Sequence, residues 1–268
     1  MMTSNDERPV GVFDSGVGGL TVVSEVIKTM PNENIIYFGD TARVPYGSKS
    51  RETVTKYARQ IMNFLIHRNV KAVIVACNTV SSNSYDALKE EFNLPIIEVV
   101  RPGVSLVIAD PGITRVGVIG TERTITSGAY EKLLKQNNPD IEVFSKACPL
   151  FVPLAEEGIT GGDIARLTAQ MYLKPLMDSG VQALILGCTH YPLLKRCIEE
   201  VMPGVKIIDP AVAAALSMKR YLTENGMQKS TVKGEYEFYC SDNTEKFSVT
   251  SGLVLGDRYR ATVVDIDG

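Results

Sequence analysis

The 268-residue sequence predicts an α/β protein with two pseudo-symmetric α/β domains, mostly parallel sheets and a functional site at the domain interface. Two observations support this prediction. Short apolar runs alternate with helical patterns along the chain, which is typical of parallel sheets covered by helices. The two halves of the chain also align with each other at a nearly constant offset, which indicates two diverged copies of one unit.

The apolar runs are short and are separated by polar or turn-forming residues, as expected for buried strands. The clearest helical pattern lies in residues 50–68, where apolar positions form one stripe and Ser50 with Glu52 suits a helix N-terminus. The predicted strands are Val10–Phe13, Asn34–Phe38, Ala72–Ala76, Pro95–Val99, Val116–Ile119, Ile141–Phe144, Ala183–Leu186, Val205–Ile208, Glu235–Cys240 and Ala261–Ile266.

The internal repeat sets the expected domain boundaries. We expect a first domain formed by residues 1–98 plus 210–268 and a second domain formed by residues 99–209, with the tail returning to the first. The aligned segments lie at offsets of 106, 108 and 111 residues: Val10–Phe13 with Val116–Ile119, Val44-Pro45 with Val152-Pro153, and Ala72–Cys77 with Ala183–Cys188.

Composition argues against several classes of partner. The net charge is -3 and the basic residues are scattered, so nucleic acid is not an expected partner. No apolar stretch is long enough to span a membrane and the start of the chain lacks a signal-peptide pattern, so we expect a cytoplasmic protein. The five cysteines include no C-x-x-C pair and are expected to be free thiols, and no metal site is expected.

Cys77 and Cys188 occupy matched positions in the repeat, each after an apolar strand and before a helical pattern. Ligands of open α/β sheets bind at such strand ends, and a helix N-terminus lowers the pKa of a thiol. Either cysteine alone is more simply a small buried side chain. Two matched cysteines, however, would face one cleft from opposite sides, which is what a stereoinverting proton transfer at one carbon requires.

Other polar residues accompany these cysteines. His190 and Asp14 are the candidates for moving protons, although a single His or Asp is more often structural. The glycine-rich turn Asp14–Gly19 can present N–H groups to an anion, and we expect a carboxylate there. The hydroxyl and amide side chains that follow each cysteine are candidates for substrate binding, and capping of a helix is the alternative for each of them.

An ordered set of motifs spans residues 11–192: Gly11–Thr21, Asp40–Gly47, Ala76–Thr79, Gly120-Thr121, Cys148-Pro149 with Val152–Leu154, and Leu186–Pro192. This set resembles the glutamate racemase family, within the aspartate/glutamate racemase superfamily. The resemblance implies two domains with the active site between them. It also implies an isomerase that interconverts L- and D-glutamate without pyridoxal phosphate or metal, supplying D-glutamate for peptidoglycan and hence for cell-wall biogenesis and cell shape.

The resemblance also assigns roles to single residues. Cys77 looks like the base that deprotonates D-glutamate and Cys188 like the base that deprotonates L-glutamate, each serving as acid in the reverse direction. Asp14 would assist Cys77, and His190 would assist Cys188 with Glu156 behind it. A homodimer is expected, with glutamate as the small-molecule partner. The implied substrate-binding residues are Asp14, Ser15, Tyr46, Gly47, Asn78, Thr79, Thr121, Thr189 and His190.

Three alternatives stay open. An aspartate racemase differs by one methylene in its substrate, so a substrate panel distinguishes it. A two-lobed binding protein that closes on a dicarboxylate without chemistry predicts that Cys77→Ser and Cys188→Ser behave alike. A hydrolase that uses Cys188 with His190 leaves Cys77 without a role. Only the racemase hypothesis uses both copies of the repeat.

Overall fold

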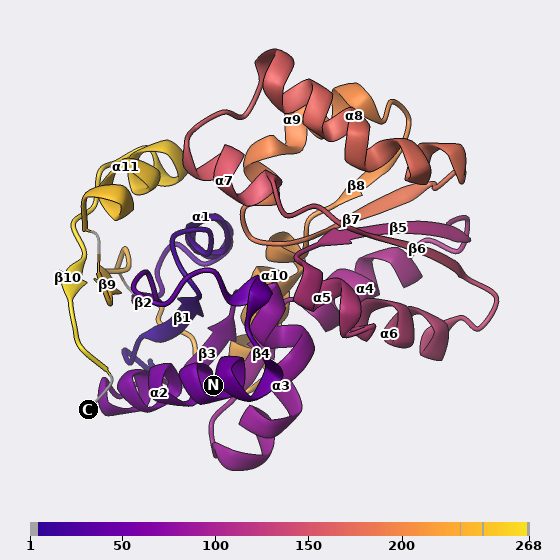
Figure 1. Cartoon of the computed structure of the whole chain (residues 1–268). Coiled ribbons are helices and arrows are strands. Elements are labelled where there is room, and N and C mark those ends of the chain that lie inside the picture. Colours follow the sequence, from indigo (N-terminus) through magenta and orange to yellow (C-terminus); the bar gives the residue numbers. More distant parts are fainter. Residues whose placement is uncertain (1–4, 231, 243, 267–268) are drawn as a thin grey trace.

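The structure, a computed structural model, describes residues 5–230, 232–242 and 244–266. Two parallel sheets covered by helices confirm the predicted α/β class (Figure 1). The first sheet, in spatial order, contains β10 (Thr262–Val263), β9 (Tyr236–Cys240), β2 (Ile35–Gly39), β1 (Val10–Asp14), β3 (Ala72–Val75) and β4 (Ile96–Glu98). The second sheet contains β6 (Glu142–Ala147), β5 (Arg115–Gly120), β7 (Ala183–Gly187) and β8 (Lys206–Ile208).

The strand order shows the internal repeat directly. The order β2-β1-β3-β4 in the first sheet is repeated as β6-β5-β7-β8 in the second. The register matches as well, because Val10 pairs with Ala72 as Val116 pairs with Ala183. Each predicted apolar run overlaps a strand, and the two tail strands extend the first sheet, with β9 pairing on β2 and β10 pairing on β9. The domain boundaries at residues 98 and 209 stay a prediction.

Helices cover both sheets. The predicted helix over residues 50–68 is α2, and the Ser50 hydroxyl caps it by accepting a hydrogen bond from the Thr53 N–H at 3.2 Å. The helices are α1 (Leu20–Thr29), α2 (Arg51–His67), α3 (Asn78–Glu91), α4 (Val100–Ile108), α5 (Glu122–Thr126), α6 (Ala129–Asn137), α7 (Phe151–Glu156), α8 (Gly162–Asp178), α9 (Lys195–Val201), α10 (Pro210–Glu224) and α11 (Thr244–Leu255), with 3-10 turns η1 (Tyr46–Ser48) and η2 (Tyr191–Leu194).

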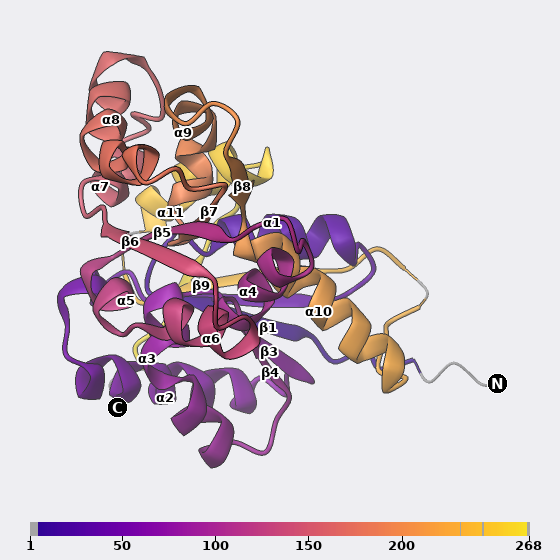
Figure 2. The same cartoon turned by 90° about the vertical axis from the view of Figure 1, so that its right-hand side faces the viewer.

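The chain crosses between the two sheets twice, at the start of α4 and at the start of α10. These two helices pack against each other, and α10 also packs on α1 of the first sheet (Figure 2). A Cβ added at Gly103 in α4 would lie 3.1 Å from the Pro210 ring in α10. The absence of a side chain at Gly103 therefore allows the two crossing segments to approach closely.

The core consists of apolar side chains on both faces of each sheet. On β1, Val12 belongs to the cluster under α1 and α10, and Phe13 belongs to the cluster under α2. Full burial of each such side chain stabilises the fold by about 1.5–3 kcal/mol. Burial on both faces explains why the predicted strands are continuous apolar runs rather than alternating patterns.

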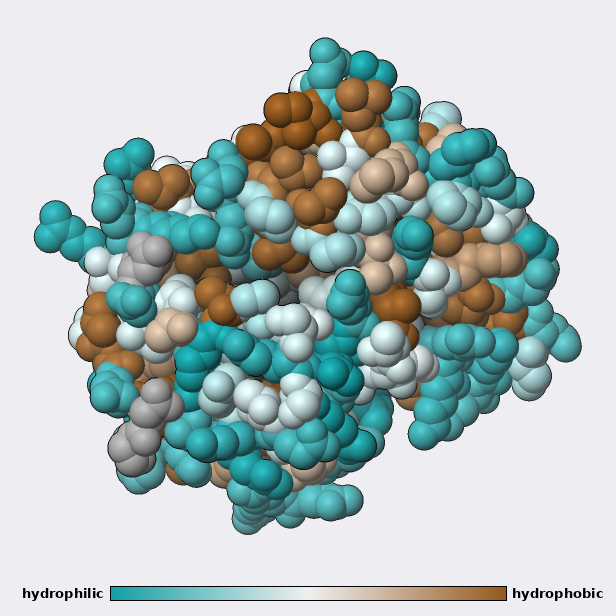
Figure 3. All heavy atoms as spheres, in the orientation of Figure 1, coloured by the Kyte–Doolittle hydropathy of each residue, from teal (hydrophilic) through white to brown (hydrophobic). Residues whose placement is uncertain are grey.

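Helix α8 is amphipathic. Its inner face, which includes Ala165, Ala169 and Leu173, is buried, whereas Ile164 and Met171 are exposed on its outer face. Apolar surface gathers where α7 and α8 lie (Figure 3). Within the part of the chain that the structure describes, no helix has the length and apolar character to cross a membrane.

Candidate active site

The candidate site lies where the carboxyl ends of β1, β3, β5 and β7 meet. Strands β2 and β3 lie on opposite sides of β1, and β6 and β7 lie on opposite sides of β5, so each sheet has a switch point there, the usual place for a ligand. A cavity of about 50 Å³ lies between the two switch points. It is lined by Ser15, Val44, Pro45, Tyr46, Gly47, Cys77, Asn78, Thr79, Thr121, Val152, Glu156, Cys188, Thr189 and His190.

The cavity therefore brings together all but one of the residues singled out from the sequence. The exception is Asp14, which is fully buried behind the wall of the cavity. Cys77 and Cys188 both line the cavity and come from the equivalent ends of β3 and β7. The repeat thus places two sulfur atoms at one site from two different sheets.

Cys77 is the N-cap residue of α3, and its thiol donates a hydrogen bond to the Ser15 hydroxyl at 3.5 Å. A backbone N–H of the helix N-terminus, that of Val80, lowers the thiol pKa as expected, but a larger effect outweighs it. Burial, reinforced by the nearby carboxylate of Asp14, raises the pKa of Cys77 to about 12. Cys77 is therefore a thiol at neutral pH in the unliganded site.

Asp14 has an unusual arrangement of partners. Its Oδ2 accepts hydrogen bonds from the Gly19 N–H at 2.8 Å and from the Thr189 hydroxyl at 3.3 Å. Its Oδ1 is buried and has no hydrogen-bond partner among the described residues. The turn that was expected to bind a carboxylate thus donates its Gly19 N–H to the protein's own Asp14.

The Cys188 side has a cation in place of a carboxylate. His190 Nδ1 lies 3.8 Å from the Cys188 sulfur, and His190 Nε2 lies 3.1 Å from Glu156 Oε1. Burial alone would lower the pKa of His190, but its hydrogen bonds to Cys188 and Glu156 outweigh burial and raise that pKa to about 10. The raised pKa favours the imidazolium form of His190 at neutral pH.

Two hydrogen-bonded groups form the polar wall between the sheets. The Thr79 hydroxyl lies 3.0 Å from the Thr121 hydroxyl, so residues of α3 and of the loop before α5 meet across the site. Thr121 also caps α5 by accepting a hydrogen bond from the Thr124 N–H, which was the alternative role for such hydroxyls. The Tyr130 hydroxyl donates to the Asn78 side-chain oxygen at 2.6 Å.

The sequence analysis missed the support behind Tyr46. The Tyr46 hydroxyl donates to Asp40, which also accepts hydrogen bonds from Arg43 at 2.7 Å and from Ser241 at 2.8 Å. Asp40 is fully buried at the end of β2. Its place after a strand was a signal that could have been used, whereas Ser241 lies 201 residues away and gave none.

Close packing leaves no room for side chains at two glycines of the site. A Cβ at Gly18 would lie 2.5 Å from the Thr189 hydroxyl and 2.6 Å from the His190 ring. A Cβ at Gly47 would lie 2.8 Å from the Thr121 Cβ. Both glycines belong to the first half of the chain and contact residues of the second, so they set how closely the two halves approach.

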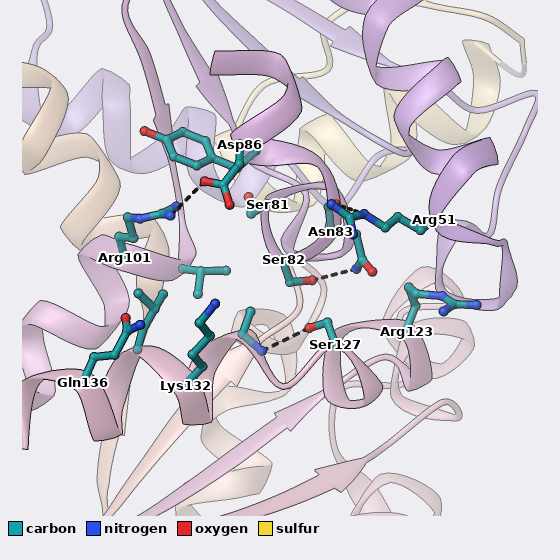
Figure 4. A pocket seen from close by; sticks show the side chains of 14 residues that line it. Arg51, Ser81, Ser82, Asn83, Asp86, Arg101, Arg123, Ser127, Lys132 and Gln136 are labelled. Atoms are coloured by element: carbon teal, nitrogen blue, oxygen red, sulfur yellow. Dashed lines mark hydrogen bonds and ion pairs between the residues drawn. The ribbon is translucent and has the colours of Figure 1, made fainter. Parts of the chain in front are cut away.

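A larger cavity of about 500 Å³ lies elsewhere, between α3, α4 and α6 (Figure 4). Its labelled side chains include Arg101, whose guanidinium reaches Asp86 at 3.1 Å, together with Arg51 and Lys132. It contains none of the predicted site residues and no cysteine. The smaller cavity is the candidate active site because it contains both cysteines, and the larger one is not, despite its size.

The fold and the site together define an α/β protein whose candidate site receives one cysteine from each of two repeated sheets. Comparison with known proteins agrees. Residues 18–218 match the family model described as Asp/Glu/Hydantoin racemase. A curated glutamate racemase from Geobacter metallireducens is 48% identical over 94% of this chain and 94% of its own.

Solved structures give the same result. A glutamate racemase from Francisella tularensis, crystallised with D-glutamate, is 45% identical with a TM-score of 0.92, covering 98% of this chain and 99% of that one. A glutamate racemase isoform from Bacillus anthracis is 35% identical with a TM-score of 0.94, covering 97% and 98%. The chain belongs to the Asp/Glu/Hydantoin racemase family and groups there with the glutamate racemases.

An aspartate racemase from Picrophilus torridus is more distant. It is 17% identical with a TM-score of 0.59, covering 84% of this chain and 96% of that one. This likeness shows a shared fold only.

Proposed function

We propose that this protein interconverts L-glutamate and D-glutamate, without a cofactor, by proton transfer between Cys77 and Cys188. The observation that carries the proposal is the cavity lined by both cysteines, each at the carboxyl end of an equivalent strand. A stereoinverting proton transfer needs an acid and a base on opposite faces of one carbon. We assign glutamate as the substrate because the relatives at 45–48% identity are glutamate racemases.

The reaction from L- to D-glutamate starts with Cys188 as thiolate and Cys77 as thiol. The Cys188 thiolate takes the α-proton, and the electron pair stays on the substrate as a carbanion. The Cys77 thiol then gives its proton to the opposite face of the same carbon, which leaves a Cys77 thiolate. The reverse reaction uses the same groups with their roles exchanged.

The two sides prepare these states by different means. Protonated His190 stabilises the Cys188 thiolate by charge, and it can return a proton to that sulfur. On the other side, the raised pKa of Cys77 keeps its proton in place until the carbanion forms. Asp14, with one free buried oxygen, is the group we assign to managing the proton of Cys77.

Substrate binding uses the polar wall of the cavity. We assign the contacts to glutamate to hydroxyl, amide and backbone N–H groups that point into it, because a dicarboxylate needs many donors and few acceptors. The proposed binding residues that line the cavity are Ser15, Tyr46, Gly47, Asn78, Thr79, Thr121, Thr189 and His190. A contact from Asp14, expected from the sequence, stays a prediction, because its side chain is buried behind the cavity wall.

The wider role follows from the reaction. D-glutamate is a building block of peptidoglycan, so we propose that the protein supplies it for cell-wall biogenesis and acts in the cytoplasm. A homodimer, the other partner expected from the sequence, stays a prediction.

The test is to incubate the purified protein with L-glutamate in D₂O, without added cofactor. Optical rotation and α-deuterium are followed together. We expect rotation to fall to zero and deuterium to appear in D-glutamate. Incorporation of α-deuterium into aspartate but not glutamate would indicate an aspartate racemase. No incorporation into either amino acid would favour a binding protein.

Cysteine variants test the mechanism within the same assay. Cys77→Ser and Cys188→Ser should each lower the rate of racemisation by at least about a hundredfold, the usual range for loss of a general acid or base. Cys197→Ser is the matched control, because this buried cysteine of α9 lies outside the cavity. Near wild-type racemisation by either site variant would rule out the two-base mechanism.

A further inference from the structure

The C-terminal tail contributes a side chain to the Cys188 side of the site. Lys246 in the first turn of α11 donates a hydrogen bond to Glu156 Oε2 at 2.7 Å. The other oxygen of Glu156 contacts His190, which contacts Cys188. Lys246 is thus the far end of a chain of four groups that leads to a proposed base.

The position of Lys246 is fixed by the residue next to it. Phe247 is fully buried and packs against Tyr37 of β2 and Phe238 of β9, with ring centroids 6.0 and 5.6 Å apart. Because α11 is anchored on the first sheet, Lys246 reaches Glu156 in α7 from the opposite half of the molecule (Figure 1). The pair links residues 90 positions apart.

Glu156 needs two partners to stay in place. Its side chain remains 18% exposed, so water competes for its oxygens. His190 occupies one oxygen and Lys246 the other, and burial, which opposes ionisation, is outweighed so that the pKa of Glu156 falls to about 2. Without Lys246, the carboxylate would have a free oxygen at the edge of the site and could turn toward solvent.

The members of this chain of contacts shift one another's pKa values. Cys188 and Glu156 act on His190, and His190 and Lys246 act on Glu156. Lys246 is not among the residues that line the cavity. The contacts that lead from Lys246 to the Cys188 sulfur run through Glu156 and His190.

We propose that Lys246 is a positioning residue for the Cys188 base, holding Glu156 against His190 from the tail of the chain. This proposal rests on the proposed racemase activity. It extends the site to a helix that carries none of the motifs of the sequence analysis. It also makes the Cys188 side complete only when the tail lies against α7.

The direction in which the pKa of His190 changes when Lys246 is removed distinguishes a positioning role from a purely electrostatic one. If Lys246 acts only as a distant cation, removing it leaves Glu156 in place and raises the pKa of His190, because a repelling charge is lost. If Lys246 positions Glu156, removing it loosens the Glu156–His190 contact and lowers the pKa of His190. We expect the second result, a fall of about one pH unit.

The experiment compares Lys246→Met, Lys246→Arg and the control Lys195→Met, which removes an exposed lysine of α9 that pairs with Glu199. The pH profile of kcat and the NMR titration of His190 are measured on each purified full-length protein. The chain has only two histidines, and His67 is exposed, so a His67→Asn background leaves one signal.

Lys246→Met should lower kcat about fivefold at pH 10 and less than about twofold at pH 8, change KM less than about twofold, and move the alkaline limb down by about one pH unit. Lys246→Arg should restore most of kcat, and Lys195→Met should match the wild type. An unchanged or upward shift of the His190 titration in Lys246→Met would overturn the proposal. The NMR titration of His190 does not depend on catalysis. If the wild-type protein were inactive, the racemase activity would be refuted, and the titration would still test whether Lys246 positions Glu156.

Discussion

The contact between Glu156 and His190 gives the sharpest prediction about pH. Glu156→Gln keeps the shape of the side chain and removes its charge. The two charged groups meet at 3.1 Å, which places their charge centres about 4 Å apart. At an effective dielectric of about 20, this interaction is about 4 kcal/mol, or about three pKa units.

The neutral amide can still accept a hydrogen bond from His190, so the full loss is an upper limit. We expect the pKa of His190 to fall from about 10 by one to three pH units in Glu156→Gln. At pH 8 the imidazolium beside Cys188 would then lose between about a tenth and about nine tenths of its population. The rate of racemisation at pH 8 should fall by up to about tenfold, the value for the full three-unit shift, while the rate near pH 6 falls less.

The assay is the circular dichroism signal of glutamate at fixed enzyme concentration, with kcat measured from pH 6 to 10. The control is Glu157→Gln, which neutralises the neighbouring exposed carboxylate at the end of α7. Its profile should match the wild type. An alkaline limb in Glu156→Gln that coincides with the wild type would refute the view that this carboxylate keeps His190 charged.

Three further predictions concern packing and stability. Gly18→Ala should leave the protein folded but lower kcat by at least about tenfold, because the new Cβ would lie 2.6 Å from the His190 ring and must displace it; circular dichroism and kinetics together check this, and wild-type kcat would contradict it. Lys71→Met should destabilise the protein to urea by about 3–5 kcal/mol, since it leaves Glu33, its fully buried partner at 2.6 Å, without a counter-charge; adding Glu33→Gln should recover part of the loss. The pKa of His190 is raised from 6.5 to about 10, so its stabilising contribution is complete below pH 6.5 and is lost as pH rises through about 10. The pKa of Glu156 is lowered from 4.5 to about 2, so its contribution is present above pH 4.5 and is lost as pH falls through about 2. Tm scans should show both losses, and His190→Asn should remove the alkaline one.

Local pattern was enough to predict most of the architecture. Strands buried on both faces must be apolar throughout, so β1, β3, β5 and β7 were visible as uninterrupted runs. The repeat then indicated that Cys77 and Cys188 occupy equivalent positions. The cavity between the sheets contains both, because equivalent strand ends of two units facing each other meet at one place.

The surroundings of each sulfur were harder to predict. A helix N-terminus follows Cys77, as expected, but burial outweighs it and the pKa of Cys77 rises. After Cys188 the chain forms the 3-10 turn η2 before α9 begins at Lys195, so this sulfur has no α-helix directly behind it. The burial of a thiol depends on the whole fold, so it cannot be predicted from the sequence pattern at the end of a strand.

Contacts between distant segments could not be predicted at all. Lys246 meets Glu156 across 90 positions, and Ser241 meets Asp40 across 201. Neither tail residue lies in a motif, and a single lysine or serine near the end of a chain is most often solvated. Their roles follow from the tertiary structure, in which β9 pairs with β2, β10 pairs with β9, and α11 between them lies close to the site.

The fold repeats, but the charges beside the two sulfurs do not. Equivalent strand ends supply opposed positions, which a proton transfer through one carbon needs in either direction. Equivalent charges would give the two sulfurs the same affinity for a proton. Part of the protein would then have two thiols or two thiolates at the site, and neither state can catalyse the proposed proton transfer. The carboxylate of Asp14 near Cys77 and the imidazolium of His190 near Cys188 make the two sides different, because an anion disfavours a nearby thiolate and a cation favours it. Divergence between the two copies is therefore as necessary to the proposed reaction as the repeat itself.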